Sequence, residues 1–205
     1  ITPRPITLSA DSATKVYGNA NPTYSVSIIS GSLPSAAVTD TLADVTGTLS
    51  RAAGENVGIY NIALGSGAKA SNYNISFDTN NQAMSITARP VYISANSGQT
   101  KVYGDADPVL AKTVQAQAAN SGLLGTDGVS LTGALARAAG EDVANNYAIG
   151  QGSLTTGSNN YSIVYTGANF AITPRPITLS ADSATKVYGN ANPTYSVSIT
   201  SGSLP

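Results

Sequence analysis

The sequence predicts an all-β chain of tandem immunoglobulin-like β-sandwich modules, each of about 86 residues, joined end to end as an extended rod. Three observations support this fold class. Long segments recur along the chain, apolar residues alternate with Ser, Thr and Asn, and clusters of Gly, Asn, Asp and Pro separate the alternating stretches. The same strand pattern leaves β-grasp-like modules open as the alternative.

A near-identical repeat opens and closes the sequence. Residues 1–34 recur at 172–205, and the only difference is Ile29 against Thr200. Because the chain starts and stops inside a repeating pattern, we expect it to be a fragment of a longer tandem array.

A more diverged copy lies between these two segments. It begins at Ile86, where Ile-Thr-Ala-Arg-Pro matches the Ile-Thr-Pro-Arg-Pro run at Ile1. Further shared motifs are Lys-Val-Tyr-Gly at Lys15 and Lys101, Arg-Ala-Ala-Gly-Glu at Arg51 and Arg137, and Asn-Tyr-x-Ile at Asn72 and Asn160. The predicted modules are repeat 1 (1–85), repeat 2 (86–171) and repeat 3 (172–205), which is the N-terminal part of a truncated module.

Alternation of period two predicts the strands. Pairs such as Ile6 and Leu8, with Thr between them, place one face of a strand inward and the other outward. The expected strands of repeat 1 are residues 5–10, 14–17, 24–29, 45–51, 59–65, 73–77 and 83–88, with counterparts in repeat 2. Turn-forming clusters separate them at 18–22, 65–67 and 78–81. About seven short strands per repeat suit a two-sheet sandwich.

Two stretches of repeat 2 are rich in helix formers. The first, 134–144, aligns with 48–58 of repeat 1, which contains Thr, Ser and Gly. Because two copies of one module share a fold, we predict a strand followed by a turn in both. The second stretch, 110–119, aligns with repeat 1 only across gaps, so its structure is left open.

A Tyr motif also indicates an immunoglobulin-like module. Glu55-Asn-Val-Gly-Ile-Tyr60 resembles a tyrosine corner, in which the Tyr hydroxyl bonds to a nearby backbone group. The counterpart Glu141–Tyr147 is one residue longer and lacks the Gly, so this corner could be distorted. The link motif Ile-Thr-x-Arg-Pro joins the last strand of one repeat directly to the first strand of the next. Its Pro favours extended backbone, which predicts a stiff link between repeats.

Composition excludes several function classes. Charged residues are only 10% of the chain and the net charge is −1, which argues against binding to nucleic acid or to an anionic membrane. No apolar run approaches the ~18 residues that span a bilayer. The chain contains no Cys or His, so a disulfide framework and the commonest general base near neutral pH are absent.

The motifs in fixed order resemble the MBG (YGX-type) and YDG repeat family. They are K-V-Y-G-[ND]-A-[ND]-P, then G-x-L-x-R-A-A-G-E-[ND]-V, then N-Y-x-I, and finally an alternating strand that ends in I-T-x-R-P. The resemblance covers nearly the whole chain. It implies a non-enzymatic module of large bacterial surface adhesins, including filamentous-haemagglutinin-like proteins exported by two-partner secretion, and it implies no catalytic residues.

Acidic side chains provide two candidate sites. Asp105 and Asp107 could attract calcium, but the equivalent loops carry Asn, and both residue types suit a tight turn before Pro. Glu55 and Glu141 could act as acid or base with Asp44 or Asp142. Their recurrence in every repeat indicates a structural turn instead. We therefore predict no catalytic, cofactor-binding or metal-binding residues, with calcium as the remaining alternative.

Two further candidates involve Lys and Tyr. Lys15, Asn72 and Glu55, with Lys101, Asn160 and Glu141 as counterparts, could form an isopeptide bond between strands. The simpler interpretation is a solvated Lys at a strand edge. Tyr clusters could stack on sugar rings, but Tyr17, Tyr60 and Tyr73 are expected in the core. The Tyr residues expected to be exposed are Tyr24, Tyr92 and Tyr165.

The predicted function is that of a structural stalk or spacer repeat of a giant bacterial surface or biofilm adhesin. It would act outside the cell, with neighbouring repeats of the same chain as its partners. The alternative is a repeated weak glycan- or protein-binding module that acts by avidity on exopolysaccharide, host glycans or other cell-surface molecules. No nucleic-acid partner and no membrane insertion of this segment are expected.

Overall fold

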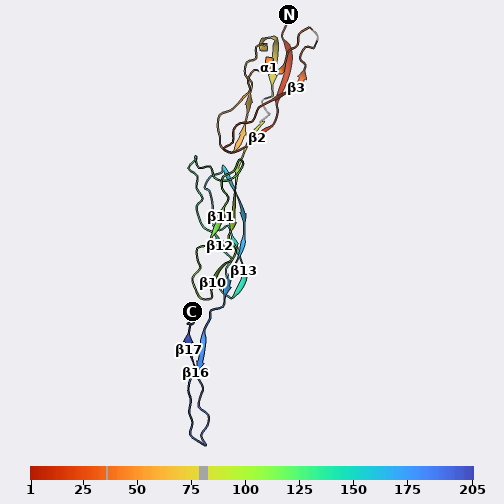
Figure 1. Cartoon of the computed structure of the whole chain (residues 1–205). Helices are drawn as coiled ribbons and strands as arrows, with labels where there is room; N and C mark the ends of the chain where they lie inside the picture. The colour runs from red at the N-terminus through yellow and green to blue at the C-terminus, as the bar shows by residue number, and fades with distance from the viewer. Residues whose placement is uncertain (36, 79–82) are drawn as a thin grey trace. The chain divides into compact units, whose positions relative to one another are not determined.

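The computed structural model describes residues 1–35, 37–78 and 83–205 (Figure 1). Over these residues the chain is mostly β, as predicted, with helix only in α1 (Leu42–Thr46) and the short 3-10 helix η1 (Ala70–Asn72). The turn predicted at 78–81 falls outside the described residues from position 79 onward.

Repeat 1 forms three small sheets. Their strands are β1 (Arg4–Ala10), β2 (Ala13–Val16), β3 (Val26–Gly31), β4 (Ser50–Arg51), β5 (Gly58–Tyr60), β6 (Ile62–Ala63), β7 (Tyr73–Phe77) and β8 (Met84–Thr87). The sheet orders are β3-β1-β7, β2-β8-β5 and β4-β6. The first strand of the repeat is therefore central in one sheet and the last strand is central in another.

Repeat 2 has an equivalent strand order, but the continuous strand β13 takes the places of β5 and β6, so two of the three sheets are joined. Its strands are β9 (Arg89–Ala95), β10 (Gln99–Val102), β11 (Lys112–Val114), β12 (Ala136–Arg137), β13 (Ala144–Gly150), β14 (Tyr161–Thr166) and β15 (Ala168–Thr173). They form sheets with the orders β11-β9-β14 and β10-β15-β13-β12. Equivalent pairs also share their register, because Lys15 faces Ile86 in β2–β8 and Lys101 faces Ile172 in β10–β15.

Two strand pairs in repeat 1 are parallel, which departs from the antiparallel sheets of an immunoglobulin sandwich. Strand β1 runs parallel to β7, and β2 runs parallel to β8. In the same two sheets, β3 pairs antiparallel with β1, and β5 pairs antiparallel with β8. The chain leads directly from the last strand of one repeat into the first strand of the next. The last two strands thus each run parallel to one of the first two, which lets the chain leave the repeat in the direction in which it entered.

The strand predicted at 45–51 is wrong over most of its length. Residues 42–46 form α1, and only Ser50–Arg51 is a strand. A capping box begins this helix, because the Thr41 hydroxyl accepts from Asp44 N at 3.3 Å and Asp44 Oδ2 accepts from Thr41 N at 2.8 Å. Val45 is fully buried, so tertiary packing stabilises a helix too short to persist alone.

The two stretches rich in helix formers are not helical. Residues 134–144 contain β12 followed by a turn, and the counterpart 48–58 contains β4 followed by a turn, as predicted. The second stretch contains β11, whose Val114 pairs with Ile93 of β9. Pairing with a neighbouring strand therefore overrides the helix propensity of this segment.

The contacts divide the chain into two compact units. Unit 1 comprises 1–91, 115–130 and 156–164, and unit 2 comprises 92–114, 131–155 and 165–205. Within unit 1, the described residues of repeat 1 include two apolar clusters. One contains Ile6, Leu8, Val45 and Tyr73, and the other contains Ala10, Val26, Ile62, Ala83, Met84 and Ile86. The alternating apolar positions predicted for β1 thus form part of the core.

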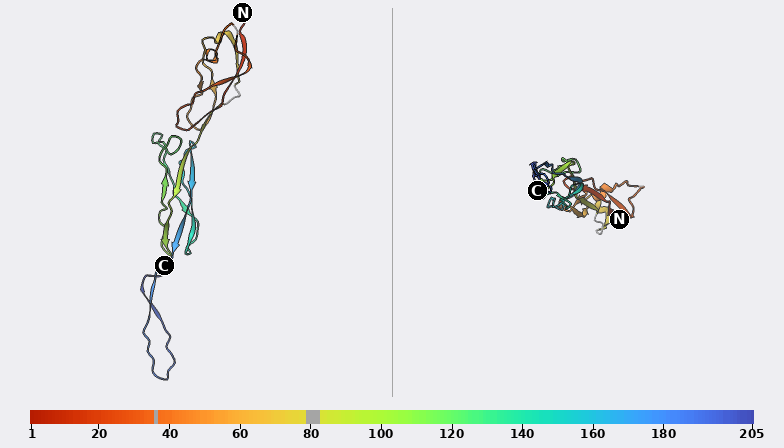
Figure 2. Two further views of the ribbon diagram at one scale, coloured as in Figure 1. Left: turned by 45° about the vertical axis from the view of Figure 1, so that its right-hand side comes forward. Right: turned by 90° about the horizontal axis from the view of Figure 1, so that it is seen from below.

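Repeat 3 consists of a hairpin of β16 (Thr178–Ala181) and β17 (Val197–Ser201), which lie side by side in both oblique views (Figures 1 and 2). Its apolar residues are exposed. Leu179 is 52% exposed, whereas Leu8, which has the same sequence neighbours in repeat 1, is 0% exposed. The difference arises because β1 packs into a complete repeat.

This pair provides a matched test of the core. We expect Leu8→Ala to lower the free energy of unfolding by about 2–5 kcal/mol, because it opens a cavity beside Val45 and Tyr73. Leu179→Ala should change it by less than about 0.5 kcal/mol. Urea denaturation of the 205-residue chain measures both. Equal effects of the two substitutions would contradict the assigned core.

Candidate functional site

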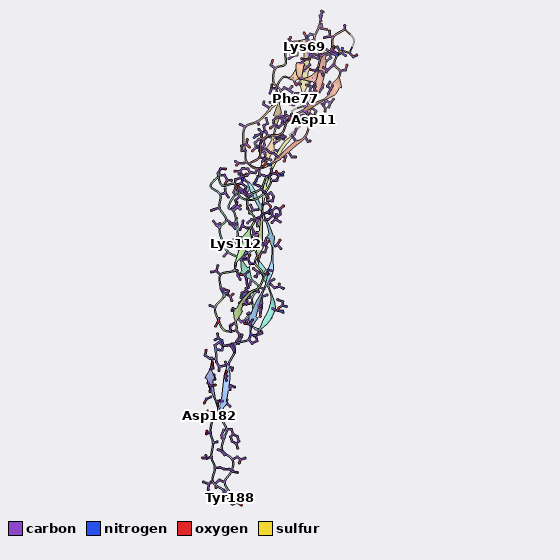
Figure 3. The ribbon with its side chains drawn as sticks, viewed as in Figure 1. Asp11, Lys69, Phe77, Lys112, Asp182 and Tyr188 are labelled. Carbon is purple, nitrogen blue, oxygen red and sulfur yellow. The ribbon has the colours of Figure 1, made fainter. Side chains whose placement is uncertain are left out.

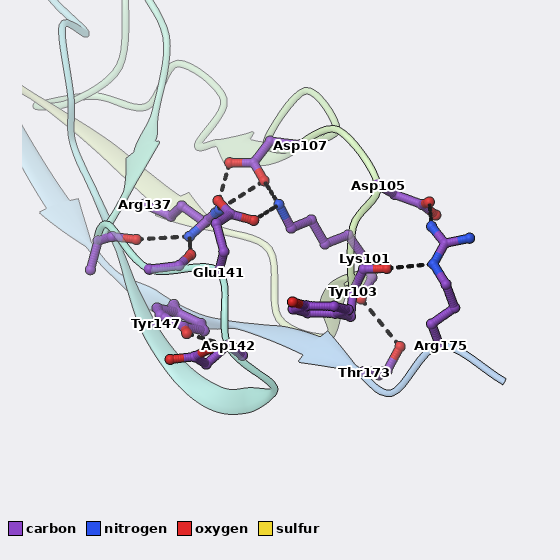
Figure 4. Close-up of polar contacts among 12 residues, drawn as sticks. Lys101, Tyr103, Asp105, Asp107, Arg137, Glu141, Asp142, Tyr147, Thr173 and Arg175 are labelled. Carbon is purple, nitrogen blue, oxygen red and sulfur yellow. Dashed lines mark hydrogen bonds and ion pairs between the residues drawn. The ribbon is translucent and has the colours of Figure 1, made fainter. Parts of the chain in front are cut away.

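Four charged side chains of repeat 2 form one cluster, which we call the charged cluster (Figure 4). It consists of Lys101 on β10, Asp107 in the following loop, Arg137 on β12 and Glu141 in the turn after β12. Lys101 Nζ lies 2.7 Å from Asp107 Oδ1 and 2.5 Å from Glu141 Oε2. Arg137 contacts the same two carboxylates at 2.7 and 2.6 Å. The cluster thereby connects two segments that are distant in sequence, one with Lys101 and Asp107 and the other with Arg137 and Glu141.

The two cations of the cluster are buried and the two carboxylates lie at its rim. The side chains of Lys101 and Arg137 are 5% and 6% exposed, whereas those of Asp107 and Glu141 are 43% and 64% exposed. A buried cation without a partner would be strongly destabilising. The Arg137 guanidinium and then the Lys101 ammonium lower the pKa of Asp107 to about 2. Hydrogen bonds to Asp107 and Glu141 raise the pKa of Lys101.

Arg137 also fixes the turn that follows β12. Its Nη1 donates to Ala138 O at 3.0 Å and to Gly140 O at 2.6 Å. Its guanidinium carbon lies 5.3 Å from the ring centroid of Tyr147 and 5.4 Å from that of Phe170. The arginine therefore combines ion pairing, backbone hydrogen bonds and cation–π contacts in one place.

Repeat 1 has the same cluster with one carboxylate fewer. Lys15 Nζ pairs with Glu55 at 2.5 Å, and Arg51 pairs with Glu55 as well. Asn21 stands at the position of Asp107, and its amide oxygen accepts from Arg51 Nε at 3.1 Å. The Lys15 hydrogen bond to Asn19 O, at 3.0 Å, takes the place of the second ion pair. Repeat 1 consequently holds two buried cations against one carboxylate.

The tyrosine corner is present in both repeats. The Tyr60 hydroxyl donates to Asn56 O at 2.7 Å, and the Tyr147 hydroxyl donates to Asp142 O at 2.8 Å. The extra residue of repeat 2 moves the acceptor one position further back but keeps the hydrogen bond. Gly140, with φ +139°, lies against the Tyr147 ring, where a Cβ atom would overlap the ring. A Gly at this position is therefore required by both backbone conformation and space.

A second polar pair recurs in both repeats and was missed by the sequence analysis. The Tyr73 hydroxyl donates to Asp40 at 2.7 Å, and the Tyr161 hydroxyl donates to Asp127 at 2.5 Å. Lys69, labelled in Figure 3, also pairs with Asp40 at 2.7 Å. The available sequence signal was the Thr that precedes both Asp40 and Asp127, but the gapped alignment of this region concealed it.

The calcium candidates are engaged by cations of the protein. Asp107 pairs with Lys101 and Arg137, and Asp105 pairs with Arg175. Among the described residues, no three acidic side chains gather closely enough to hold a metal ion. The loop that contains these carboxylates therefore serves ion pairing within unit 2.

The carboxylates considered for acid–base chemistry have structural partners. A hydrogen bond from Lys15 lowers the pKa of Glu55, and a hydrogen bond from Lys101 lowers that of Glu141. A general acid needs a raised pKa, so these shifts run in the opposite direction. Asp44 caps α1, and the contact of Asp142 with Tyr147 is made by its backbone carbonyl.

The isopeptide candidates come together only in part. Lys15 and Glu55 form an ion pair, but Asn72 is not among the described partners of Lys15. Asn160 instead donates to Asn56 Oδ1 and accepts from Val57 N, both at 2.9 Å. The simpler interpretation, a solvated Lys at a strand edge, is confirmed for the edge position of β2 but wrong for solvation, because the Lys15 side chain is only 4% exposed.

The Tyr predictions are confirmed in part. Tyr73 is buried in the core and Tyr92 is exposed, as predicted. Tyr17 and Tyr60 are half-buried. Tyr24 and Tyr165 were predicted to be exposed but are half-buried, and Tyr165 donates to Ile149 O at 2.9 Å.

These features define a class of protein, a tandem array of small β-modules in which the recurring motifs serve internal ion pairs and turns. The MBG domain (YGX type) family matches residues 6–82 and 91–171, and the chain belongs to this family. The matched domains are non-catalytic, and domains of this kind are typical of bacterial surface proteins. No curated protein and no solved structure matches the chain. None of the described helices has the length and apolar character to cross a membrane.

Exchange of Asp and Asn between the two clusters tests the role of the fourth charge. We expect Asp107→Asn to lower the free energy of unfolding at pH 7 by about 1 kcal/mol, a modest value because solvent screens this half-exposed carboxylate. The reverse change in repeat 1, Asn21→Asp, should increase it by supplying the missing carboxylate. Thermal denaturation across pH measures both effects.

The pH dependence of that difference follows from the pKa of Asp107. Its value in the folded protein, about 2, lies below the ordinary value of 3.8, so its contribution is complete above about pH 4. It is lost as the pH falls from about 3.8 towards 2, and the gap between the original protein and Asp107→Asn should close there. A gap that persists at pH 2 would show that the substitution acts through packing and not through charge.

Proposed function

We propose that the chain is part of an extracellular structural stalk or spacer of a large bacterial surface or biofilm adhesin, without enzymatic activity. One observation carries this proposal. Two MBG domains follow one another, and in each the family motifs are used to pair buried cations and to fix turns. Because these motifs stabilise each repeat from within, a repeat can be copied in tandem and serve as a mechanical unit.

The topology supports the same proposal. The first two strands of repeat 1 run parallel to its last two, which would let the chain leave each repeat in the direction of entry, so added repeats would extend the array. The stiff Arg-Pro link would limit bending between repeats. We propose module boundaries at 85/86 and 171/172, a sandwich-like packing of the sheets within each repeat, and a rod-like array whose reach grows with the number of repeats.

Small-angle scattering of the 205-residue chain tests the spacer. A compact protein of this length would have a radius of gyration of about 17 Å. We expect a clearly larger value and an elongated distance distribution. A chelator should leave the curve unchanged, because Asp105 and Asp107 are paired with Arg175, Lys101 and Arg137. A compact particle would contradict the spacer, and a curve altered by the chelator would contradict calcium independence.

Weak binding of glycans or proteins by each repeat is the second candidate. A cavity of about 490 Å³ lies beside the charged cluster of repeat 1 and is lined by Asn21, Tyr24, Arg51 and Glu55 among others. Such polar and aromatic groups can bind sugars, and tandem copies would add avidity. Saturable binding of the chain on a glycan array, abolished by Arg51→Gln, would favour this candidate over a pure spacer.

A further inference from the structure

The tripeptide that gives the YGX family its name faces residues of the following repeat. In unit 1, Tyr17, Gly18 and Asn19 each lie against side chains or backbone between positions 118 and 161. We propose that this tripeptide is a docking surface whose partner is the next repeat, and that the link arginine holds the two together. We call the contacts of residues 17–19 and Arg89 with repeat 2 the joint.

Arg89 is the centre of the joint. It is 1% exposed, and its Nη1 donates to Tyr17 O at 3.2 Å and to Asn19 Oδ1 at 3.1 Å. On the other side, Nε donates to Gly122 O at 2.9 Å and Nη2 donates to Ser121 O at 3.0 Å and to Ala118 O. These acceptors match the N–H donors of a guanidinium one for one. A single buried side chain thus connects the Tyr-Gly-Asn loop to a loop of repeat 2.

All acceptors of Arg89 named above are neutral oxygens, and no carboxylate pairs with it in the described part of the chain. A buried guanidinium of this kind is stabilised only while every acceptor stays in place. Displacement of either loop would leave a buried charge with unmet donors. The geometry of Arg89 therefore favours one relative position of the two loops.

Tyr17 and Gly18 complete the joint. The Tyr17 ring packs edge-on against Tyr161, with 5.5 Å between centroids, and its hydroxyl donates to Asp127 at 3.3 Å. Asp127 also accepts from Tyr161, so one carboxylate serves a Tyr from each repeat. A Cβ atom on Gly18 would overlap Leu124, and the φ of +81° likewise favours Gly. Each position of the tripeptide thus has a physical reason.

The same arginine recurs at the next link. In unit 2, Arg175 donates to Tyr103 O at 2.7 Å and pairs with Asp105, which are the equivalents of Tyr17 and Asn19. At the first link, Arg4 donates to Ser32 O at 2.6 Å and to Ser32 Oγ at 2.7 Å, and Ser32 belongs to the repeat that follows this link. Arg4 and Arg175 each form one half of the contacts that Arg89 forms completely.

Repeat 3 shows the tripeptide uncovered. Tyr188 has the same sequence neighbours as Tyr17, yet it is fully exposed at the tip of the hairpin (Figure 3). Nothing lies within 4 Å of the Cβ position of Gly189. Tyr17 is half-buried because it packs against the apolar cluster around Met84 in its own repeat and against Tyr161 of repeat 2, and Gly18 lies close to Leu124. Among the described residues, the hairpin of repeat 3 has neither set of neighbours. This inference goes beyond the spacer function, because the joint would form equally in an array that binds glycans.

Hydrogen exchange of single amides, measured by NMR on the 205-residue chain, tests the joint. Val57 N donates to the Asn160 side chain and therefore reports docking, whereas Ala52 N donates to Asn61 O within repeat 1. We expect Arg89→Gln to speed exchange at Val57 roughly tenfold or more, since hydrogen bonds to a charged group are lost. Exchange at Ala52 should not change.

Matched substitutions separate docking from folding. Asn19→Ala removes one acceptor of Arg89 and should speed exchange at Val57 by a smaller factor, while Asn190→Ala, its counterpart in repeat 3, should have no effect. Arg4→Gln should leave Val57 unchanged as well. Unchanged exchange at Val57 in both Arg89→Gln and Asn19→Ala would overturn the proposal. Equal acceleration at Val57 and Ala52 in both variants would overturn it too, by showing that these residues stabilise the repeat and not the joint.

Discussion

Buried cations held by carboxylates at the rim are the interaction on which each repeat depends. Lys101 and Arg137 lie where strand β10, the following loop and the turn after β12 meet, and neither cation could remain there unpaired. The contiguous Lys-Val-Tyr-Gly and Asp-Ala-Asp-Pro motifs and the distant Arg-Ala-Ala-Gly-Glu motif supply one cluster. The Lys, Arg and Glu of the cluster recur in both repeats, whereas Asn21 of repeat 1 stands in place of Asp107 and supplies a neutral hydrogen bond instead of a charge.

The direction of the chain is the second constraint. Each repeat begins with strands that run parallel to its last strands, so the exit of one repeat is also the entrance of the next. A short link with this topology brings its arginine next to the loop that follows the second strand. The same side chain can then contact both repeats, as Arg89 does. Strand topology and link chemistry are therefore two consequences of one requirement for continuation.

Sequence patterns predicted the features that depend on local alternation and on short motifs. Strand β1 and the hydrogen bond of the Tyr60 corner are of this kind. Helix α1 was missed because its capping box has Asp44 in place of the usual Glu, and because the buried Val45 that stabilises it depends on tertiary packing. The partner of Lys15 was only half predicted, since alternation cannot show which of Asn72, Asn19 or Glu55 a folded loop brings to a strand.

The repeats differ where charge can be changed without altering geometry. Asn19 and Asn21 of repeat 1 correspond to Asp105 and Asp107 of repeat 2, and repeat 3 carries Asn at both positions again. Asn and Asp have nearly the same shape, so both the charged cluster and the contact with the link arginine survive the exchange. The neutral form relies on hydrogen bonds, whereas the acidic form adds ion pairs that salt weakens. The contact of Arg175 with Asp105 therefore depends more on ionic strength than the contact of Arg89 with Asn19.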